Sequence, residues 1–141
     1  MELIEIVKDA WGFTGLIPVR VIDVNAFGNL LVEDADGRTW RICPEELSCE
    51  IAATTPQEIE KIRSSDDWSM GRLVDLATAA HGRPVEGRCF CLKIPAVLGG
   101  KYDVSNIGTV TIAELIAFSG DLASQIKDLP DGAPITFKFL D

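Results

Sequence analysis

Three of the seven expected strands come from residues 17–43, which read IPVRVIDVNAFGNLLVEDADGRTWRIC. Runs rich in Val, Ile, Leu and Trp alternate there with two groups of turn formers, Asn25-Ala26-Phe27-Gly28 and Asp34-Ala35-Asp36-Gly37. β-branched and aromatic residues favour strands, and Asn-, Asp- and Gly-rich turns between such runs favour hairpins. The stretch therefore predicts three antiparallel strands, over residues 17–24, 29–33 and 38–43. In the third, Trp40 and Ile42 are expected on one face, and Arg41 and Cys43 on the other.

Helices are expected on both sides of this stretch. Residues 2–11 place apolar side chains at helical spacing, and a fourth short strand is expected over residues 48–53. Thr55-Pro56-Gln57-Glu58 then has the pattern of a capping box, which predicts a helix to about residue 63. A second helix start at Ser65 predicts a helix to His81, whose apolar face consists of Trp68, Leu73, Leu76, Ala77 and Ala80.

The second half of the chain adds fewer strands. A buried strand is expected over 88–94, a short strand over 107–110 and a last strand over 134–140, with an irregular segment at 97–106. Thr111-Ile112-Ala113-Glu114 is another capping box and predicts a helix to Ile126. Because strands cluster instead of alternating strictly with helices, the predicted class is α+β, with a mostly antiparallel sheet and helices packed against it.

Length and composition limit the possible classes of protein. The 141 residues, 47% of them hydrophobic, fit a single domain over 1–141, and no linker divides them. The apolar residues are dispersed, and Glu2, Glu5, Lys8 and Asp9 occupy the first ten positions, which excludes a membrane protein and a signal peptide. We therefore expect a cytoplasmic protein.

The charge is strongly acidic and unevenly distributed. The chain carries 22 acidic and 13 basic side chains, for a net charge of −9. This balance argues against nucleic-acid binding, which needs clustered Lys and Arg, and favours a basic partner. Residues 1–70 hold 14 acidic and 6 basic side chains, and residues 71–141 hold 8 and 7. The excess of acidic side chains in residues 1–70 therefore either promotes solubility in the ordinary way or forms an acidic surface on the first half of the chain.

No catalytic or metal-binding pattern emerges from the residues that carry chemistry. The four cysteines, Cys43, Cys49, Cys89 and Cys91, form no Cys-x-x-Cys pair, and buried thiols are favoured over zinc ligands. The single histidine, His81, stands at an expected helix end, where a surface cap is favoured over a catalytic base. We therefore expect no catalytic residue, no metal and no cofactor.

Two further motifs resemble ligand-binding loops without matching them. Asp34-Ala35-Asp36-Gly37 begins like a calcium loop, but an expected strand follows before the required glutamate. Gly99-Gly100-Lys101 suggests a phosphate-binding loop, but Tyr102 stands where Ser or Thr is required. The first is interpreted as a β-turn, and the two glycines as positions of positive φ or close backbone approach.

Several short motifs, taken in order, resemble a bacterial family. They are Leu98-Gly99-Gly100-Lys101-Tyr102 with Asn106, then Glu114-Leu115, then residues 120–126, and upstream residues 25–29, Asp36-Gly37, residues 40–45 and Asp67-Trp68. In these motifs the chain is similar to type VI secretion immunity proteins of the DNase-immunity type, through their C-terminal domain. The resemblance is clearest over about 65–140 and weaker over 17–53. It implies a cytosolic, non-enzymatic protein that binds and blocks a co-encoded toxin, and it implies no catalytic residues.

The resemblance and the charge together give a hypothesis for the site. A nuclease toxin attracts a polyanion, so an acidic inhibitor can place carboxylates where phosphates would lie. The expected partner-binding residues are Glu33, Asp34, Asp36, Arg38, Glu45, Glu46, Asp66 and Asp67. Trp40 is either central to that surface or a core residue, and burial is favoured for Trp40 and Trp68. The segment 98–106 is either a functional loop or scaffold. The rival interpretations are an adaptor or small-ligand-binding module, and a small enzyme built around His81 or the cysteines.

Overall fold

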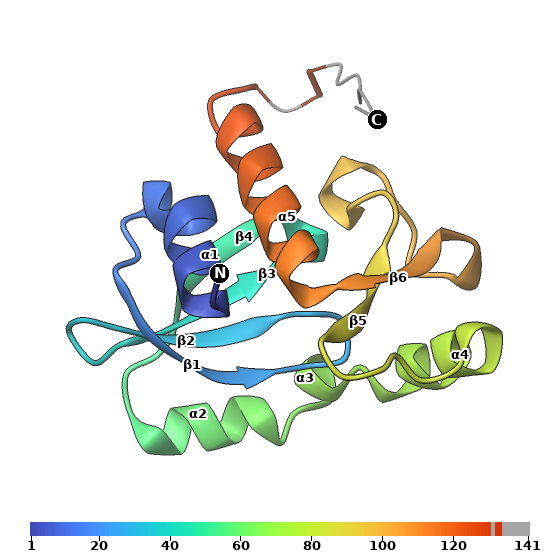
Figure 1. The fold of residues 1–141 in the computed structure, drawn as a ribbon, viewed down its shortest axis with the longest axis horizontal. Helices are drawn as coiled ribbons and strands as arrows, with labels where there is room; N and C mark the ends of the chain where they lie inside the picture. Colours follow the sequence, from blue (N-terminus) through green and yellow to red (C-terminus); the bar gives the residue numbers. More distant parts are fainter. Residues whose placement is uncertain (131, 134–141) are drawn as a thin grey trace.

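A four-stranded antiparallel meander forms one part of the computed structural model, which describes residues 1–130, 132 and 133 (Figure 1). Its strands are β1 (Pro18–Val24), β2 (Leu30–Asp34), β3 (Thr39–Cys43) and β4 (Ser48–Ala53), paired in chain order. In register, Leu30 of β2 lies opposite Ile42 of β3. The predicted meander and the α+β class are therefore confirmed.

The first hairpin turn is fixed by a side chain. Asn25 Oδ1 accepts hydrogen bonds from the backbone N–H of Phe27 at 3.0 Å and of Asn29 at 2.9 Å. Gly28 has a φ of +70°, and a Cβ there would lie 2.7 Å from a methyl carbon of Leu115. Glycine is required here for both its backbone conformation and its lack of a side chain.

The first and last helices pack beside each other against the meander (Figure 1). They are α1 (Leu3–Trp11) and α5 (Ile112–Ile126), and α5 begins at the predicted cap, where the Glu114 N–H donates to Thr111 Oγ1. A Cβ on Gly120 would lie 2.5 Å from the Ala10 carbonyl oxygen, so the two helices approach closely there. The main core joins these helices to the sheet, through Val7, Trp11, Leu16, Leu30, Val32, Trp40, Ile42, Ile116 and Ala123.

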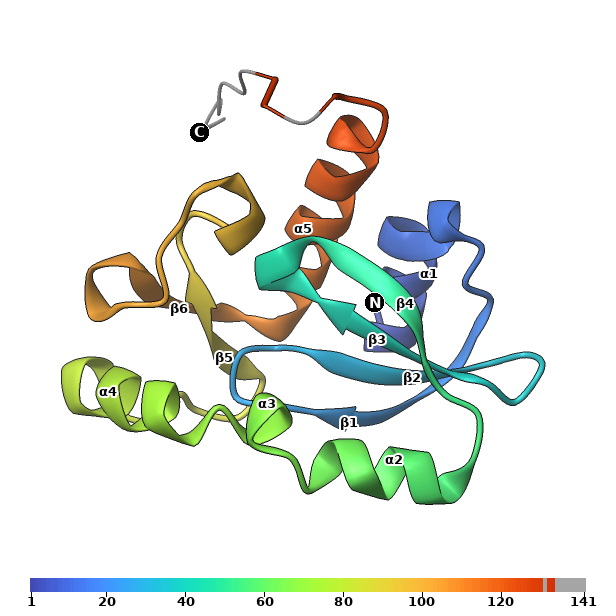
Figure 2. The ribbon, with the colours of Figure 1, turned by 180° about the vertical axis from the view of Figure 1, so that it is seen from behind.

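Three further helices run from the end of β4 toward the second sheet (Figure 2). They are α2 (Pro56–Arg63), α3 (Asp66–Ser69) and α4 (Gly71–His81), and the predicted cap of α2 is confirmed by a hydrogen bond from the Glu58 N–H to Thr55 Oγ1. The prediction of one continuous helix from Ser65 to His81 is wrong, because Met70 adopts a left-handed conformation with a φ of 50°. The predicted apolar face is interrupted as a result: Trp68 and Ala77 are buried, whereas Leu76 and Ala80 are exposed.

A separate two-stranded sheet completes the described fold. It pairs β5 (Arg88–Leu92) with β6 (Ile107–Thr111), and the Phe90 N–H donates to the Ala26 carbonyl, joining this sheet to the first hairpin turn. A second core cluster lies here, formed by Phe27, Ala77, Phe90, Leu92 and Ile107. β5 ends two residues earlier than predicted, and the strand expected over 134–140 lies outside the described residues. Among the described helices, none combines the length and the apolar character needed to cross a membrane.

Candidate functional site

A cavity with a volume of about 1010 Å³ opens beside α4, and we call it the α4 cleft. Its walls come from the end of β3, the 3₁₀ turn η2 (Pro44–Glu46), the helices α3 and α4, and the segment that carries Tyr102. The lining residues are Arg41, Cys43, Glu45, Glu46, Ser48, Asp66, Asp67, Ser69, Met70, Gly71, Arg72, Leu73, Leu76 and Tyr102. Parts of the chain that are far apart in sequence therefore meet at one concave surface.

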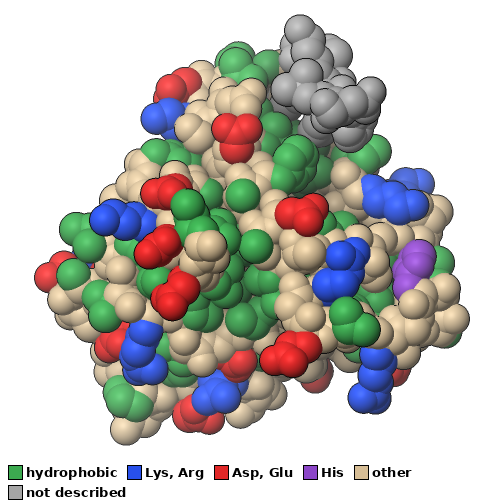
Figure 3. All heavy atoms as spheres, viewed as in Figure 1, with side chains coloured by type: hydrophobic (Ala, Val, Ile, Leu, Met, Phe, Trp, Pro, Cys, Tyr) green, Lys and Arg blue, Asp and Glu red, His purple; other side chains and the backbone are tan. Residues whose placement is uncertain are grey.

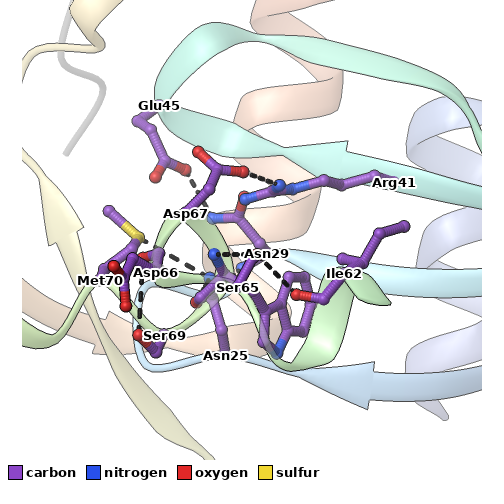
Figure 4. Close-up of polar contacts among 11 residues, drawn as sticks. Asn25, Asn29, Arg41, Glu45, Ile62, Ser65, Asp66, Asp67, Ser69 and Met70 are labelled. Atoms are coloured by element: carbon purple, nitrogen blue, oxygen red, sulfur yellow. Dashed lines mark hydrogen bonds and ion pairs between the residues drawn. The ribbon is translucent and has the colours of Figure 1, made fainter. Parts of the chain in front are cut away.

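Four polar side chains connect these walls, and we call them the Arg41 network (Figure 4). Arg41 donates from Nε and Nη2 to Asn29 Oδ1, at 3.2 and 3.0 Å, and from Nη1 to Asp67 Oδ2. Asn29, which is fully buried, donates from Nδ2 to Glu45 Oε1 at 2.7 Å. The network thereby links α3, β3 and η2 through charge-assisted hydrogen bonds, which are stronger than neutral ones.

The same arginine also holds α3 through an aromatic ring. The Arg41 guanidinium lies 5.2 Å from the centroid of the buried Trp68 ring, within the range of a cation–π interaction. Asn25 Nδ2 donates to the Trp68 carbonyl at 2.9 Å, so the first hairpin turn holds the backbone of α3 as well. The burial expected for Trp68 is confirmed. This one-turn helix is fixed to the meander from two sides.

Glu45 is buried at the wall of the cleft. Only 6% of the residue is exposed, and burial raises the pKa of its carboxyl group, although hydrogen bonds from Asn29 and its surroundings oppose that shift. The expectation that Glu45 belongs to an accessible acidic surface therefore does not fit its position. Its carboxyl group instead accepts a hydrogen bond within the Arg41 network. A buried carboxyl group needs such hydrogen-bond partners.

The glycine-containing segment, residues 98–106, contributes Tyr102 to the cleft. Gly99 has a φ of +96°, and a Cβ on Gly100 would lie 1.8 Å from the Ile94 carbonyl oxygen. The interpretation of these glycines as positions of positive φ and close approach is therefore confirmed. Asn106 closes the segment by donating from Nδ2 to the carbonyls of Ile94 and Lys101. Tyr102 Oη donates to Glu46 Oε1 at 2.7 Å, which joins this segment to η2.

The remaining predicted site residues lie at the opposite end of β3. At about 3.4 Å per residue, the hairpin that joins β2 to β3 lies roughly 20 Å from η2. Asp34 is only 4% exposed and accepts hydrogen bonds from Trp40 Nε1 and from Nε and the backbone N–H of Arg38. Burial alone would raise the pKa of Asp34, but these hydrogen bonds outweigh it and lower the pKa to about 2. Asp34 thus stabilises its own hairpin and is not an accessible carboxylate.

The predicted partner-binding residues therefore form two separate groups. Glu45, Glu46, Asp66 and Asp67 line the α4 cleft, whereas Glu33, Asp34, Asp36 and Arg38 lie at the far hairpin, where Arg38 also pairs with the exposed Asp36 and Glu33 pairs with Arg20. Trp40 is buried in the core, as was favoured. The prediction omitted Arg41, Tyr102 and the apolar residues of α4. Strand alternation placed Arg41 and Cys43 on the face opposite Trp40, and that face lines the cleft.

The environments of the four thiols and of His81 fit structural roles. Burial raises the pKa of all four thiols, that of Cys49 to about 11 and that of Cys89 to about 12. His81 ends α4, and its Nε2 lies 3.0 Å from the Ile107 carbonyl oxygen. Within residues 1–130, 132 and 133, no group of three or more His, Cys, Asp or Glu side chains is placed to hold a metal ion.

A second, smaller cavity of about 320 Å³ lies on the other side of η2, beside α5. Its lining is mainly apolar and includes Phe27, Leu92, Leu115 and the half-exposed Phe118. Glu45 lines this cavity as well as the cleft. Figure 3 shows hydrophobic side chains gathered around α5 on this side of the molecule, with acidic and basic side chains scattered around them.

Comparison with known proteins identifies the segment that builds most of the cleft. The model of the family described as T6SS immunity protein Tdi1, C-terminal, matches residues 57–123. No curated protein and no solved structure matches the chain. The matched segment supplies nine of the fourteen residues that line the α4 cleft, and the meander supplies the other five. The part of the resemblance over residues 17–53 lies outside the match. Immunity proteins, as a class, are generally non-enzymatic. Over residues 57–123, which are just under half of the chain, this protein is similar to the T6SS immunity protein Tdi1 C-terminal family.

Proposed function

We propose that this chain is a cytoplasmic immunity protein that binds a co-encoded type VI secretion toxin at the α4 cleft and blocks it without catalysis. The observation that carries the proposal is the composition of the cleft. The segment that matches the immunity family contributes α3, α4 and Tyr102, and the meander contributes Arg41 and η2. A concave surface with accessible apolar and charged groups suits protein recognition, in which an apolar centre and a polar rim act together.

Charge supports a basic partner. The cleft is lined by four carboxylate residues against two arginines, and Glu46, Asp66 and Asp67 are the exposed ones among the acids. A toxin that acts on nucleic acid must attract phosphates, so carboxylates on the inhibitor compete for the same basic surface. Such complementarity raises the association rate and the specificity more than the affinity itself. We therefore propose a nuclease as the toxin.

Co-expression tests the proposal directly. The protein encoded by the adjacent reading frame is expressed alone and together with this chain, and growth and co-purification are measured. We expect growth arrest that this chain relieves, with a complex that survives purification. If arrest persists, or if no complex forms, the immunity proposal is wrong. Loss of plasmid DNA or of RNA in the arrested cells distinguishes a nuclease from other toxins.

A small-ligand-binding module is the second candidate function, and the apolar cavity beside α5 favours it. Its volume of about 320 Å³ lies within the range typical of small-molecule sites, and its lining combines apolar side chains with Glu45 and Lys93. Native mass spectrometry of the purified chain tests it. A co-purified small molecule that is lost in Leu115→Trp, a substitution that fills the cavity, would support this function.

A further inference from the structure

We infer that the α4 cleft takes one amphipathic, basic helix of the toxin, and this inference rests on the proposed immunity function. Met70, Leu73 and Leu76 all line the cleft, and they are spaced three residues apart. Residues at such spacing share one face of a helix. Within α4, Leu73 and Leu76 therefore form an apolar stripe along the cleft, about 4.5 Å long at 1.5 Å per residue, and Met70 adds to it from the break before the helix. Leu76 is 46% exposed, so the stripe is accessible to a partner.

The cleft also carries polar groups, from η2, α3 and the segment of Tyr102. Tyr102, which is 45% exposed, donates to Glu46, and Asp66 and Asp67 stand on the first turn of α3. Asp67 already pairs with Arg41, so among the exposed carboxylates that line the cleft, Glu46 and Asp66 are the two without an ion pair in the described residues. An occupant therefore meets both an apolar stripe and two accessible carboxylates in the same cleft.

This arrangement selects the occupant by its chemistry. A helix laid into a groove presents anchors at spacings of three and four residues, as in many helix-in-groove complexes. Apolar anchors on such a helix pack against Leu73 and Leu76, and a Lys or Arg on its flank reaches Glu46 or Asp66. Because the Arg41 network fixes η2 and α3 to the same strand, the cleft is preorganised, which lowers the entropic cost of binding.

The test compares cleft variants with matched variants outside the cleft, using the adjacent-frame protein as the probe in biolayer interferometry. Leu76→Asp places a charge on the apolar stripe, and Val85→Asp makes the same change at a residue that is 68% exposed and does not line the cleft. Asp66→Lys reverses a rim charge. Asp75→Lys reverses one on the same stretch of chain, at a position that lines a different groove beside α4.

We expect Leu76→Asp to weaken binding about tenfold or more, as for a central interface residue. Asp66→Lys is expected to slow association about threefold or more at low salt, as for a rim charge. Val85→Asp and Asp75→Lys are expected to bind like wild type. Overlapping peptides of the adjacent-frame protein then identify the occupant, which must carry Lys or Arg beside apolar residues at helical spacing.

The outcomes separate this inference from the proposed function. If wild type forms no complex, the immunity proposal fails, and the inference fails with it. If wild type binds and both cleft variants bind equally well, the toxin docks elsewhere and only the helix-in-cleft inference is overturned. Circular dichroism confirms folding of each variant, and a binding peptide that is acidic or lacks apolar anchors also overturns the inference.

Discussion

The carboxylate of Asp34 accepts four hydrogen bonds, all from residues of its own hairpin. Its donors are the backbone N–H groups of Asp36 and Arg38, together with Arg38 Nε and Trp40 Nε1. An acidic residue in a turn is usually expected to face solvent. The Asp34 carboxylate instead accepts hydrogen bonds from the side chains of Arg38 and Trp40, which connects the start of β3 to the end of β2. Its contribution to the protein is therefore stability, and that contribution depends on its ionised form.

Substituting Asp34 with Asn tests this role through pH. The folded-state pKa is lowered from the usual 3.8 to about 2, so between these values the unfolded chain binds a proton that the native state does not. The stabilisation is fully present above pH 3.8 and is lost as the pH falls toward 2. Urea unfolding at a series of pH values should give a difference between wild type and Asp34→Asn that is large near neutrality and shrinks in acid. The exposed Asp36→Asn is the control, and a difference independent of pH would contradict the prediction.

The contribution of Glu45 to stability should change with pH in the opposite sense. Burial raises its folded-state pKa above the usual 4.5, so the native state holds the proton to a higher pH than the unfolded chain does. Ionisation of Glu45 therefore reduces stability as the pH rises above 4.5. Glu45→Gln keeps an acceptor for Asn29 and avoids that cost. We expect its melting temperature to equal that of wild type near pH 4.5 and to match or exceed it near neutrality.

Thermal melts of Glu45→Gln and Glu45→Ala, followed by circular dichroism, check this prediction. The Ala variant removes the acceptor and leaves Asn29 Nδ2 unpaired in the interior, so it should melt below wild type at every pH. A Gln variant that loses stability relative to wild type as the pH rises would be the contrary result.

At the scale of elements, the contact of α1 with α5 depends on a missing side chain. Glycine inside a helix costs about 1 kcal/mol relative to alanine, so Gly120→Ala would stabilise an isolated α5. In the protein the added Cβ would lie 2.5 Å from the Ala10 carbonyl oxygen and 2.6 Å from the Ala10 Cβ, and α1 would have to move. We expect a net loss of about 1–3 kcal/mol in the free energy of unfolding, as for overpacked cores.

Gly12→Ala is the matched control for Gly120→Ala. Its backbone has a φ of −61°, and a Cβ there would meet no atom within 4 Å. Alanine at such a position is neutral or stabilising by about 0.4–1 kcal/mol, because it restricts the unfolded chain. Chemical denaturation of both variants should therefore give changes of opposite sign. Equal effects would mean that the close approach of the two helices does not contribute to stability.

Local sequence predicted the elements whose ends depend on their own residues. The caps at Thr55 and Thr111 and the meander turns could be predicted, because each is set by side chains within four positions in the chain. The break at Met70 could not. A left-handed methionine is unfavourable locally, and it is held here by packing against the second core cluster and by contact with Asn25, 45 positions away.

The same distinction explains the candidate site. Composition drew attention to the carboxylates, and four of them line the α4 cleft. The burial of Asp34 and Glu45 could not be predicted, because it depends on partners from other strands and turns, such as Asn29. The inclusion of Tyr102 depends on a contact 56 positions away along the chain. Residue type thus indicated the kind of chemistry, and tertiary contacts determined which residues are accessible.

At the scale of the whole molecule, the thiols should be protected as long as the chain is folded. Burial raises the pKa of Cys49 to about 11 and of Cys89 to about 12, well above the ordinary thiol value. At a pH near 8 the native thiolate fraction is then about 100-fold or more below that of the unfolded chain. Ellman's reagent should react slowly with the native protein and rapidly in guanidinium chloride. A thiol that reacts equally fast in both states would contradict this prediction.

The net charge of −9 should affect the rate of toxin binding. Long-range attraction between an acidic inhibitor and a basic toxin speeds their encounter and is screened by salt. We expect the association rate constant with the adjacent-frame protein to fall about tenfold between low and high salt, while the dissociation rate constant changes little. Stopped-flow mixing over a series of salt concentrations measures both. An association rate independent of salt would exclude electrostatic steering.

The Arg41 network also determines which segment of this protein can be transferred to another protein as a unit. The segment that matches the immunity family contains Asp67 and Trp68, but the residues that hold them, Asn25, Asn29 and Arg41, belong to the meander. A chimera that transplants residues 57–123 onto an unrelated sheet would leave Asp67 and the Trp68 ring without these neighbours. The smallest portable unit therefore begins no later than β1, and libraries that shuffle toxin specificity should exchange both walls of the cleft together.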